Sequence, residues 1–407
     1  MKFFSKYFCL FTFYFLLHPL SSQDIKYARK IIDTLTSPSM HGRGYVNNGE
    51  KTAAKYLAGE FKNFKLSYWG QNYFQNFGLN INTFPGNMFV SIDEKPLSRG
   101  KDFIVGGTSA GKKGSFEIKN VSNADYSGSH SRKRSRIAFV ITENVQITPD
   151  CNNCLLLFIE KNKLTMDIAT VSGRIPMLHI SATAFDSLSK KIKINIENKM
   201  INNYQTQNVI GYIPGTQYPD SFIIFSAHYD HLGQMGKDIY FPGANDNASG
   251  CALMLNLMGY YSQHPPKYSI AFMAFGAEEA GLVGSKYYVE HPLFPLKQIK
   301  FLINLDLLGT GDEGITVVNG SVFKTEFDEL VKINEGKKYL PQIKIRGKAA
   351  NSDHYFFSEN GVKCFFIYTL GGIKAYHDIY DRPETLPLTK FEDVFRLLTD
   401  FSTYLQK

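Results

Sequence analysis

Several strand-like segments in the second half of the chain end in side chains that bind metal ions or move protons. In chain order these are His228 and Asp230 after FIIFSA, Glu278 and Glu279 after SIAFMAFGA, Asp306 after FLINL, and His377 one loop after KCFFIY. In an open α/β sheet, ligands and catalytic groups gather at the carboxyl ends of the strands, where the loops converge on one crevice. We therefore expect these side chains to meet at a single edge of a sheet.

Each of these residues also has an ordinary structural explanation. Two adjacent glutamates are typical of the first turn of a helix, where negative charge suits the helix dipole. Asp246, in GANDNASG, is typical of a helix N-cap. Asp306 fits a turn after a strand, and His377 fits an exposed loop. Their joint placement favours a functional site, because independent accidents would not gather at one sheet edge.

The types of donor favour zinc. Two imidazoles with three carboxylates suit zinc better than magnesium or calcium, which prefer shells made of oxygen alone. Five ligands exceed the three that a single catalytic zinc normally takes, but they suit two zinc ions that share one bridging carboxylate. Three carboxylates against two Zn²⁺ leave a single positive charge, which one bridging hydroxide would neutralise. The sequence therefore predicts two zinc ions.

Glu278 and Glu279 are neighbours, so at a strand-to-helix turn their side chains diverge and only one is expected to hold metal. The other faces the water and is the natural general base, which passes the proton of the water to a leaving amine. Asp230 comes two residues after His228. It is placed to accept the other N–H of that imidazole and so to fix its tautomer.

The elements that must position these groups are typical of an α/β protein. From about residue 207, short apolar strands alternate with helical segments such as ASGCALMLNLMGYYS and KTEFDELVKINE. Continuous apolar strands with intervening helices predict a mostly parallel sheet covered on both faces. The expected fold class is α/β, a three-layer, mostly parallel sheet with helices on both faces, plus an inserted mostly-β domain.

The texture of the sequence divides the chain into four parts. Residues 1–22 place Lys2 and Lys6 ahead of an apolar run, which is typical of a secretory signal peptide; an uncleaved membrane anchor is the alternative. Residues 23–83 are predicted to be a helical part of the α/β domain, 84–205 the β-rich insertion, and 206–407 the main core. This organisation predicts an exported protein, secreted or periplasmic, with no membrane span after cleavage.

The composition excludes several other classes. The 407 residues are 43% hydrophobic and 20% charged, which fits a globular protein and not a disordered one. The densest basic cluster, HSRKRSR, lacks the interleaved aromatic residues of a nucleic-acid surface, so we expect a solvated loop and no nucleic-acid partner. Cys151 and Cys154 suit a small disulfide or half of a zinc knuckle, whereas Cys251 and Cys364 are typical of core residues.

The motifs resemble those of a known family. AHYDHLG, PGANDNASG, FGAEEAGLVGS, INLDLLG, SDHYFF and YHDIYDRPETL follow one another in this order over about residues 207–385. Their order and spacing resemble the co-catalytic zinc exopeptidases, which include bacterial secreted aminopeptidases and glutamate carboxypeptidase. SMHGRGY and the helix after it look like the usual beginning of that family's domain, so the resemblance covers both sides of the insertion.

The resemblance implies five metal ligands and one base. His228 and Asp306 would hold one zinc ion, Glu279 and His377 the other, Asp246 would bridge them, and Glu278 would be the general base. Ser352, Asp353 and His354 match a loop that lines the site, with no role assigned. The insertion, with RIPMLHIS near its end, is similar to the protease-associated domain of many members.

The expected function is therefore that of a secreted zinc aminopeptidase acting on a peptide substrate. Carboxypeptidase or dipeptidase action is an alternative, because such relatives use a similar metal set. A one-zinc glutaminyl cyclase is another alternative, because NLDLLG in this chain is a little closer to the version of the motif found in those enzymes. Transferrin receptors keep the fold but have lost metal ligands; the presence of all five ligands argues against such a binding protein. No feature predicts an oligomeric state.

A rival nucleophile occurs in GTSAG, residues 107–111, which matches the G-x-S-x-G elbow of serine hydrolases. That elbow needs a helix directly after the serine. KKGSFEIKNV follows instead, and it is strand-like. We therefore expect Ser109 to lie in a loop and to have no catalytic role.

Overall fold

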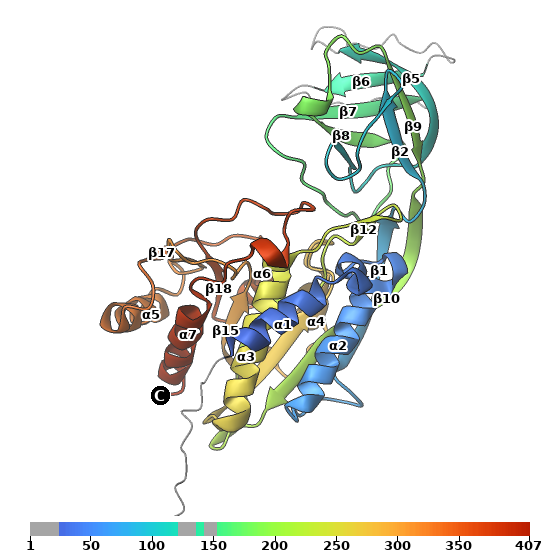
Figure 1. The fold of residues 1–407 in the computed structure, drawn as a ribbon. Helices are drawn as coiled ribbons and strands as arrows, with labels where there is room; N and C mark the ends of the chain where they lie inside the picture. The colour runs from blue at the N-terminus through green and yellow to red at the C-terminus, as the bar shows by residue number, and fades with distance from the viewer. Residues whose placement is uncertain (1–23, 121–135, 142–152) are drawn as a thin grey trace, which may run out of the picture.

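The computed structural model describes residues 24–120, 136–141 and 153–407, drawn in colour in Figure 1. The predicted signal peptide, Cys151 and all of the HSRKRSR cluster except Arg136 lie outside the described residues. Within the described residues, no helix combines the length and the apolar character needed to cross a bilayer.

An eight-stranded mixed sheet forms the centre of the larger part of the molecule. Its strands are β1 (Phe74–Thr83), β10 (Lys199–Ile213), β11 (Tyr218–His228), β14 (Tyr268–Phe275), β15 (Ile299–Leu305), β16 (Ile315–Val318), β17 (Ile343–Ile345) and β18 (Cys364–Thr369). They lie side by side in the order β1-β10-β14-β11-β15-β18-β16-β17. The central strands β14, β11, β15 and β18 run parallel, whereas β10 and β16 run antiparallel to their central neighbours. The predicted mostly parallel sheet is confirmed.

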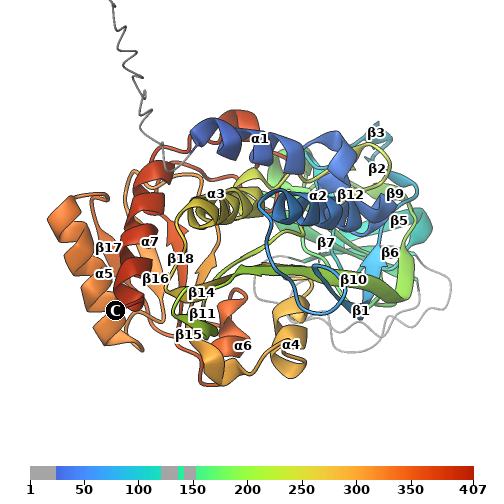
Figure 2. The ribbon, with the colours of Figure 1, turned by 90° about the horizontal axis from the view of Figure 1, so that it is seen from below.

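Helices cover both faces of this sheet, as Figure 2 shows. The helices are α1 (Ile25–Leu35), α2 (Gly49–Asn63), α3 (Gly250–Gln263), α4 (Val283–Glu290), α5 (Lys324–Lys337), α6 (His354–Glu359) and α7 (Phe391–Leu405). In Figure 2, α1, α2, α3 and α7 lie above the sheet, and α4 and α6 lie below it. The three-layer arrangement expected from the sequence is therefore confirmed.

Alternation along the strands explains the two cores. In β11, Ile223 and Phe225 are buried in the same cluster as α1, α2, α3 and α7. Ile224 points to the opposite face and packs with Tyr288 of α4 and Phe357 of α6. Because successive side chains of a strand point to opposite faces, a continuous apolar run is needed where both faces are covered. That is why the run FIIF within FIIFSA is apolar throughout.

A second eight-stranded sheet is formed by the chain between β1 and β10. Its strands are β2 (Met88–Ile92), β3 (Lys95–Pro96), β4 (Phe103–Val105), β5 (Lys112–Asn120), β6 (Ile137–Ile141), β7 (Cys154–Glu160), β8 (Met177–Ser181) and β9 (Lys191–Ile196). The order is β3-β2-β9-β5-β6-β7-β8-β4. Figure 1 shows this sheet as a separate body joined to the first through the long pair β1 and β10. The β-rich insertion is thus a second sheet, whereas its likeness to a protease-associated domain stays a prediction.

Ser109 lies in the loop between β4 and β5, and its side chain serves the loop. Its Oγ accepts a hydrogen bond from the Met177 N–H at 2.9 Å and donates one to the Ala110 carbonyl at 3.1 Å. Strand β5 begins at Lys112, so no helix follows the serine. The prediction that Ser109 lies in a loop is confirmed, and the nucleophile elbow is excluded.

A fully buried arginine joins the SMHGRGY segment to the loops of the main sheet. Arg43 donates five hydrogen bonds to carbonyl oxygens, through Nε to Tyr229 at 2.8 Å, through Nη1 to Leu35 at 3.0 Å and Pro242 at 2.6 Å, and through Nη2 to Gly243 at 2.8 Å and Asp246 at 3.1 Å. A guanidinium has five N–H donors, so all of them are used. Three separate stretches of chain are thereby tied to one side chain.

The glycines on either side of Arg43 permit this close approach. Gly42 has a φ of 63°, and a Cβ at this position would lie 2.4 Å from the carbonyl oxygen of Gly233. A Cβ on Gly44 would lie 2.3 Å from the Cα of Gly233. Both contacts are shorter than van der Waals packing permits, so only glycine fits at either position. The sequence GRG therefore places the arginine against the HLG turn.

Replacing Arg43 by Met is expected to lower the free energy of unfolding by about 3 kcal/mol or more, because five buried carbonyl oxygens lose their donor. Chemical denaturation followed by circular dichroism measures this change. Arg396→Met is the matched control, because Arg396 is exposed and its ion pair with Glu392 spans 3.7 Å. The control is expected to change stability by less than about 0.5 kcal/mol. Equal effects of the two substitutions would contradict the role given to Arg43.

Candidate active site

The carboxyl ends of the central strands bring the predicted groups together. His228 is the last residue of β11 and pairs in register with Phe275, the last residue of β14. On the other side, Ser226 of β11 pairs with Asn304 of β15. These three parallel strands therefore end at the same level. The loops after β14 and β15 start beside His228, which is why residues far apart in the sequence meet here.

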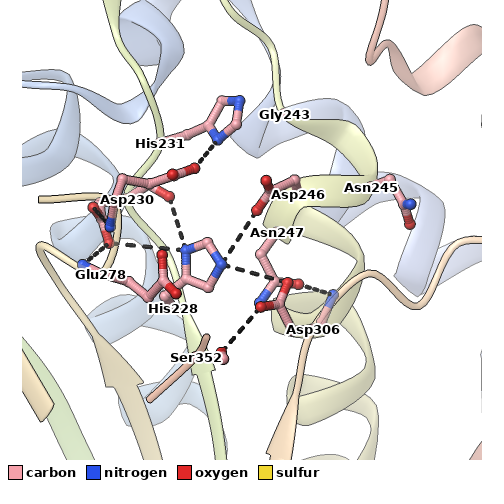
Figure 3. Close-up of polar contacts among 12 residues, drawn as sticks. His228, Asp230, His231, Gly243, Asn245, Asp246, Asn247, Glu278, Asp306 and Ser352 are labelled. Carbon is pink, nitrogen blue, oxygen red and sulfur yellow. Dashed lines mark hydrogen bonds and ion pairs between the residues drawn. The ribbon is translucent and has the colours of Figure 1, made fainter. Parts of the chain in front are cut away.

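The predicted ligands form two imidazole–carboxylate groups that share Asp246. His228 Nε2 lies 3.2 Å from Asp246 Oδ1 and 3.4 Å from Asp306 Oδ1, as Figure 3 shows. His377 Nε2 lies 3.0 Å from Asp246 Oδ2 and 3.1 Å from Glu279 Oε2. These side chains are at most 16% exposed. Asp246 thus presents one carboxylate oxygen to each imidazole.

The backbone of Asp246 is held from two sides. Asp246 lies in the turn Ala244–Ser249 that leads into α3. The carboxylate of Asp381 accepts hydrogen bonds from the N–H of Asn245 at 2.8 Å and from the N–H of Asp246 at 3.0 Å. Arg43 binds the carbonyl oxygen of Asp246. The shared carboxylate is therefore fixed by one buried acid and one buried base that come from distant parts of the chain.

Asp306 is oriented by a relay of side chains across the sheet. Ser226 Oγ donates to Asn304 Oδ1 at 2.7 Å, Asn304 Nδ2 donates to Ser352 Oγ at 2.8 Å, and Ser352 Oγ donates to Asp306 Oδ2 at 3.1 Å. Among the described residues, no group donates a hydrogen bond to the buried Asp306 Oδ1. That oxygen faces His228, so the relay turns one oxygen of Asp306 toward the imidazole.

Asp230 makes contacts other than those expected from the sequence. Its carboxylate accepts hydrogen bonds from the N–H groups of Glu278 at 3.0 Å and Glu279 at 3.3 Å. The nearest carboxylate oxygen lies 3.9 Å from His228 Nδ1, beyond hydrogen-bond distance, and the backbone oxygen of Asp230 is closer at 3.3 Å. The carboxylate of Asp230 is therefore bound by the two N–H groups at the start of the glutamate turn, and not by the imidazole. Asp230 therefore orients the glutamates directly, and its contact with the imidazole runs through the backbone.

His231 is a buried member of the site that the sequence analysis did not assign. Its Nδ1 lies 2.7 Å from Glu279 Oε1, and its ring meets the ring of His377 edge-on with centroids 5.8 Å apart. With His231 on one oxygen and His377 on the other, both oxygens of Glu279 are occupied. The signal was the second histidine of HYDHLG, at the end of the same strand as His228.

The charges of the site depend on one another. Burial disfavours the ionised form of Asp246, but hydrogen bonds from His228 and His377 outweigh it and hold its pKa well below the usual range. Burial likewise opposes ionisation of Glu279, yet its neighbouring imidazoles lower its pKa to about 2. Burial lowers the pKa of His377, but Glu279 and Asp246 outweigh it and raise the value to about 11. The carboxylates therefore draw positive charge onto the imidazoles between them.

The pKa of Glu278 is shifted in the opposite direction from that of Glu279. Burial raises the pKa of its carboxyl well above the usual value, and the negative charges of Glu279 and Asp353 add to the rise. Among the described residues, no imidazole is recorded in a hydrogen bond or ion pair with the Glu278 carboxylate. Two adjacent residues of one type thus have opposite electrostatic environments, as is typical of acid–base groups with separate tasks.

These donors fit metal cations. Sets of three donor residues lie close enough to share an ion: His228 with Asp246 and Asp306, His228 with Glu278 and Glu279, and His231 with Asp246 and Glu279. The raised pKa of His377 shows that the site favours a positive charge where its imidazole meets Asp246 and Glu279. Mixed imidazole and carboxylate donors suit zinc. The donor types therefore fit zinc, and the third set contains His231 where the sequence predicted His377.

A cavity of about 190 Å³ opens beside this cluster. Its walls include four acidic side chains and His228 and His377 of the cluster. The other lining residues are Leu307, Arg346, Asn351, Phe366, Tyr368 and Tyr376. The cavity lining thus combines a cluster of acids and imidazoles with three aromatic rings and one arginine.

The SDHYFF segment contributes unequally to the site. Ser352 reaches Asp306, as described above. Asp353 is fully buried, and burial raises its pKa to about 7. His354 is buried, and its ring packs against Phe366 with centroids 5.3 Å apart. Of the three residues left without a role, only Ser352 contacts a predicted ligand.

Comparison with known proteins gives a consistent family and fold. Residues 208–402 match Peptidase family M28. Aminopeptidase YwaD from Bacillus subtilis is 30% identical over 222 residues, which cover 51% of this chain and 46% of that protein. The chain therefore spans less than half the length of this curated relative.

Two solved structures share the fold along nearly the whole chain. One is that of BSAP, a zinc aminopeptidase from Bacillus subtilis, with a TM-score of 0.71 at 20% identity over 94% of this chain and 95% of that one. The other is a Peptidase M28 precursor from Shewanella amazonensis, with a TM-score of 0.73 at 14% identity over 95% and 94%. Both sheets of this chain thus belong to a fold already seen in these proteins.

The buried His354 gives a pH dependence of stability. Burial lowers the pKa of its imidazole to about 4, whereas an unfolded chain has a value of about 6.5. Between these values the unfolded chain binds a proton that the folded protein does not, so this contribution to stability is present above about pH 6.5 and is lost as the pH falls. Unfolding free energies measured from pH 7 to pH 4.5 should fall less steeply for His354→Gln than for the wild type. The exposed His264→Gln is the control; a slope equal to that of wild type in His354→Gln would refute the prediction.

Proposed function

This chain belongs to peptidase family M28 through residues 208–402, and on that premise we propose that it is an exported zinc aminopeptidase. It would remove N-terminal residues from peptides. The observation that carries the proposal is the position of Asp246, which offers one carboxylate oxygen to each of two imidazoles. Each imidazole also faces a carboxylate of its own. Such a donor set suits a pair of zinc ions that share one ligand.

Two zinc ions would divide the ligands between the two imidazoles that face Asp246. His228 and Asp306 would hold one ion, His377 and Glu279 the other, and Asp246 would be common to both. When bound, zinc supplies a Lewis acid that polarises the scissile carbonyl and makes a water molecule more acidic. The orienting contacts support this division, because Ser352 turns Asp306 and His231 turns Glu279 toward the imidazoles.

Glu278 is proposed to act as the general base. Its carboxylate would take a proton from the attacking water and deliver it to the nitrogen of the leaving amine. Its raised pKa supports this role, because a carboxyl that holds a proton more readily than usual can both accept and return one near neutral pH. The hydrogen bond from its N–H to Asp230 fixes the start of the turn that aims the side chain.

The cavity supports action at the end of a chain. The acidic side chains that line it would attract the ammonium group of a free amino terminus, and the attraction is stronger where water is excluded. A volume of about 190 Å³ suits a terminal residue better than a chain that passes through. Phe366, Tyr368 and Tyr376 would contact the first side chain.

Replacing Glu278 by Gln is expected to leave two zinc ions bound per chain and to lower kcat by at least about a hundredfold, because the proton carrier is lost while the proposed ligands remain. Elemental analysis and hydrolysis of a chromogenic amino-acid amide measure the two quantities. Unchanged turnover would remove Glu278 from its role. One zinc ion per wild-type chain would favour the cyclase alternative.

Digestion of short peptides tests the direction of cleavage. A free tripeptide is expected to lose its N-terminal residue, whereas the N-acetylated peptide is not cleaved, because it lacks the ammonium group. A chelator is expected to abolish activity and added zinc to restore it. Mass spectrometry identifies the products. Cleavage of the acetylated peptide from its carboxyl end would indicate a carboxypeptidase, and exported protein that does not begin near Gln23 would contradict the proposed signal peptide.

A further inference from the structure

Residues of the β-rich insertion contact the candidate active site. The chain between β7 and β8 passes beside the loop that carries His377. The N–H of Met166 donates to the carbonyl oxygen of His377 at 2.8 Å, and His377 Nδ1 lies 3.1 Å from the carbonyl oxygen of Met166. The Met166 side chain is itself buried in the core of the second sheet. One residue of the insertion thus contacts both the backbone and the ring of a predicted metal ligand.

Lys163 makes a second set of contacts with the same loop. Its Nζ donates to the carbonyl oxygens of Lys374 at 3.0 Å and Tyr376 at 2.9 Å, and it lies 3.7 Å from Asp378 Oδ2. An ammonium group has three N–H donors. Three acceptors from five consecutive residues therefore surround this ammonium, and they curve the loop around it.

The loop needs such support. His377 has a φ of 55°, in the left-handed region that non-glycine residues rarely adopt and hold only when the surroundings impose it. The ring of Tyr376 stacks on the imidazole at a centroid distance of 4.0 Å. Within the described part of the chain, the backbone carbonyls of residues 374–377 accept hydrogen bonds only from Lys163 and Met166. The insertion therefore supplies the external hydrogen bonds that hold this backbone.

We propose that the segment from Lys163 to Met166 positions His377 for its metal ion, with Lys163 as a positioning residue. The inference rests on the proposed function, in which His377 is a ligand. A hydrogen bond from Nδ1–H to the Met166 carbonyl leaves Nε2 as the nitrogen that faces Asp246 and Glu279. The Lys163 ammonium keeps the loop at the distance where this bond forms. The β-rich insertion is thereby a working part of the metal centre.

The consequence is specific to one of the two ions. Contacts that orient a ligand are worth about 10- to 100-fold in metal affinity. Removing the Lys163 ammonium should weaken the ion held by His377 and Glu279 by that factor. The ion held by His228 and Asp306 should keep its affinity, because the relay through Ser352 does not involve the insertion.

The test is a zinc titration of the full-length protein, stripped of metal, against a chromogenic chelator. Lys163→Met keeps the length of the side chain and removes its three donors; Lys193→Met, at an exposed position on β9 in the second sheet, is the matched control. For Lys163→Met we expect one dissociation constant to rise 10- to 100-fold and the other to stay within twofold of wild type. Lys163→Arg should recover most of the loss, since its guanidinium can donate to the same carbonyls.

Each other outcome overturns the inference. Two unchanged dissociation constants in Lys163→Met would show that the ammonium does not position His377. Equal weakening of both ions, or a drop in the thermal midpoint of the metal-free protein that Lys193→Met does not share, would show a purely structural role. The same titration distinguishes failure of the proposed function from failure of this inference. Wild-type protein that binds fewer than two zinc ions would refute the two-ion centre, whatever the result for Lys163→Met.

Discussion

Several carboxylates lie buried together at the ends of apolar strands, and the contacts among the surrounding loops follow from that burial. Asp306 and Glu279 each come within 4.8 Å of Asp246, and all three carboxylates are nearly inaccessible to water. Uncompensated buried charges of one sign cost several kcal/mol each. Imidazoles placed between the carboxylates provide part of the compensation, and metal cations would provide the rest. The same crowding that makes the site costly without cations would give it affinity for them.

A ring of hydrogen-bonded groups holds the acids in place without neutralising them. Arg43 and Asp381 form hydrogen bonds with the turn that carries Asp246, and Asp230 forms hydrogen bonds with the turn that carries the two glutamates. These groups bind backbone atoms, so they fix where each side chain begins. Ser352 instead binds a side chain, because its hydroxyl donates to the carboxylate of Asp306. The geometry of the site is therefore set by contacts among loops that strands of one sheet deliver to a common edge.

The second sheet takes part in this arrangement. Residues of the HLG turn and of the strand after it, including Leu232 and Met235, are buried in its core, so the two sheets share a boundary close to the predicted metal ligands. The loop of His377 lies on that boundary and is held from the side of the insertion. The inserted domain therefore adds contacts of its own to those that the main sheet provides at the site.

Local patterns in the sequence were enough to predict the main strands and helices and the types of side chain that meet at the candidate site. Apolar runs and three- and four-residue spacing depend only on local side-chain direction, so FIIFSA, SIAFMAFG and the helix at residues 25–35 were predictable, and parallel strands direct His228, Glu279 and Asp306 to one edge by rule. The pairs of groups that come into contact could be identified from the folded structure but not from these patterns. The bond of Asp230 to the glutamate turn, the contact of His231 with Glu279 and the grip of Met166 on His377 join residues separated by 48, 48 and 211 positions. Such contacts depend on how loops close over one another, which no local pattern records.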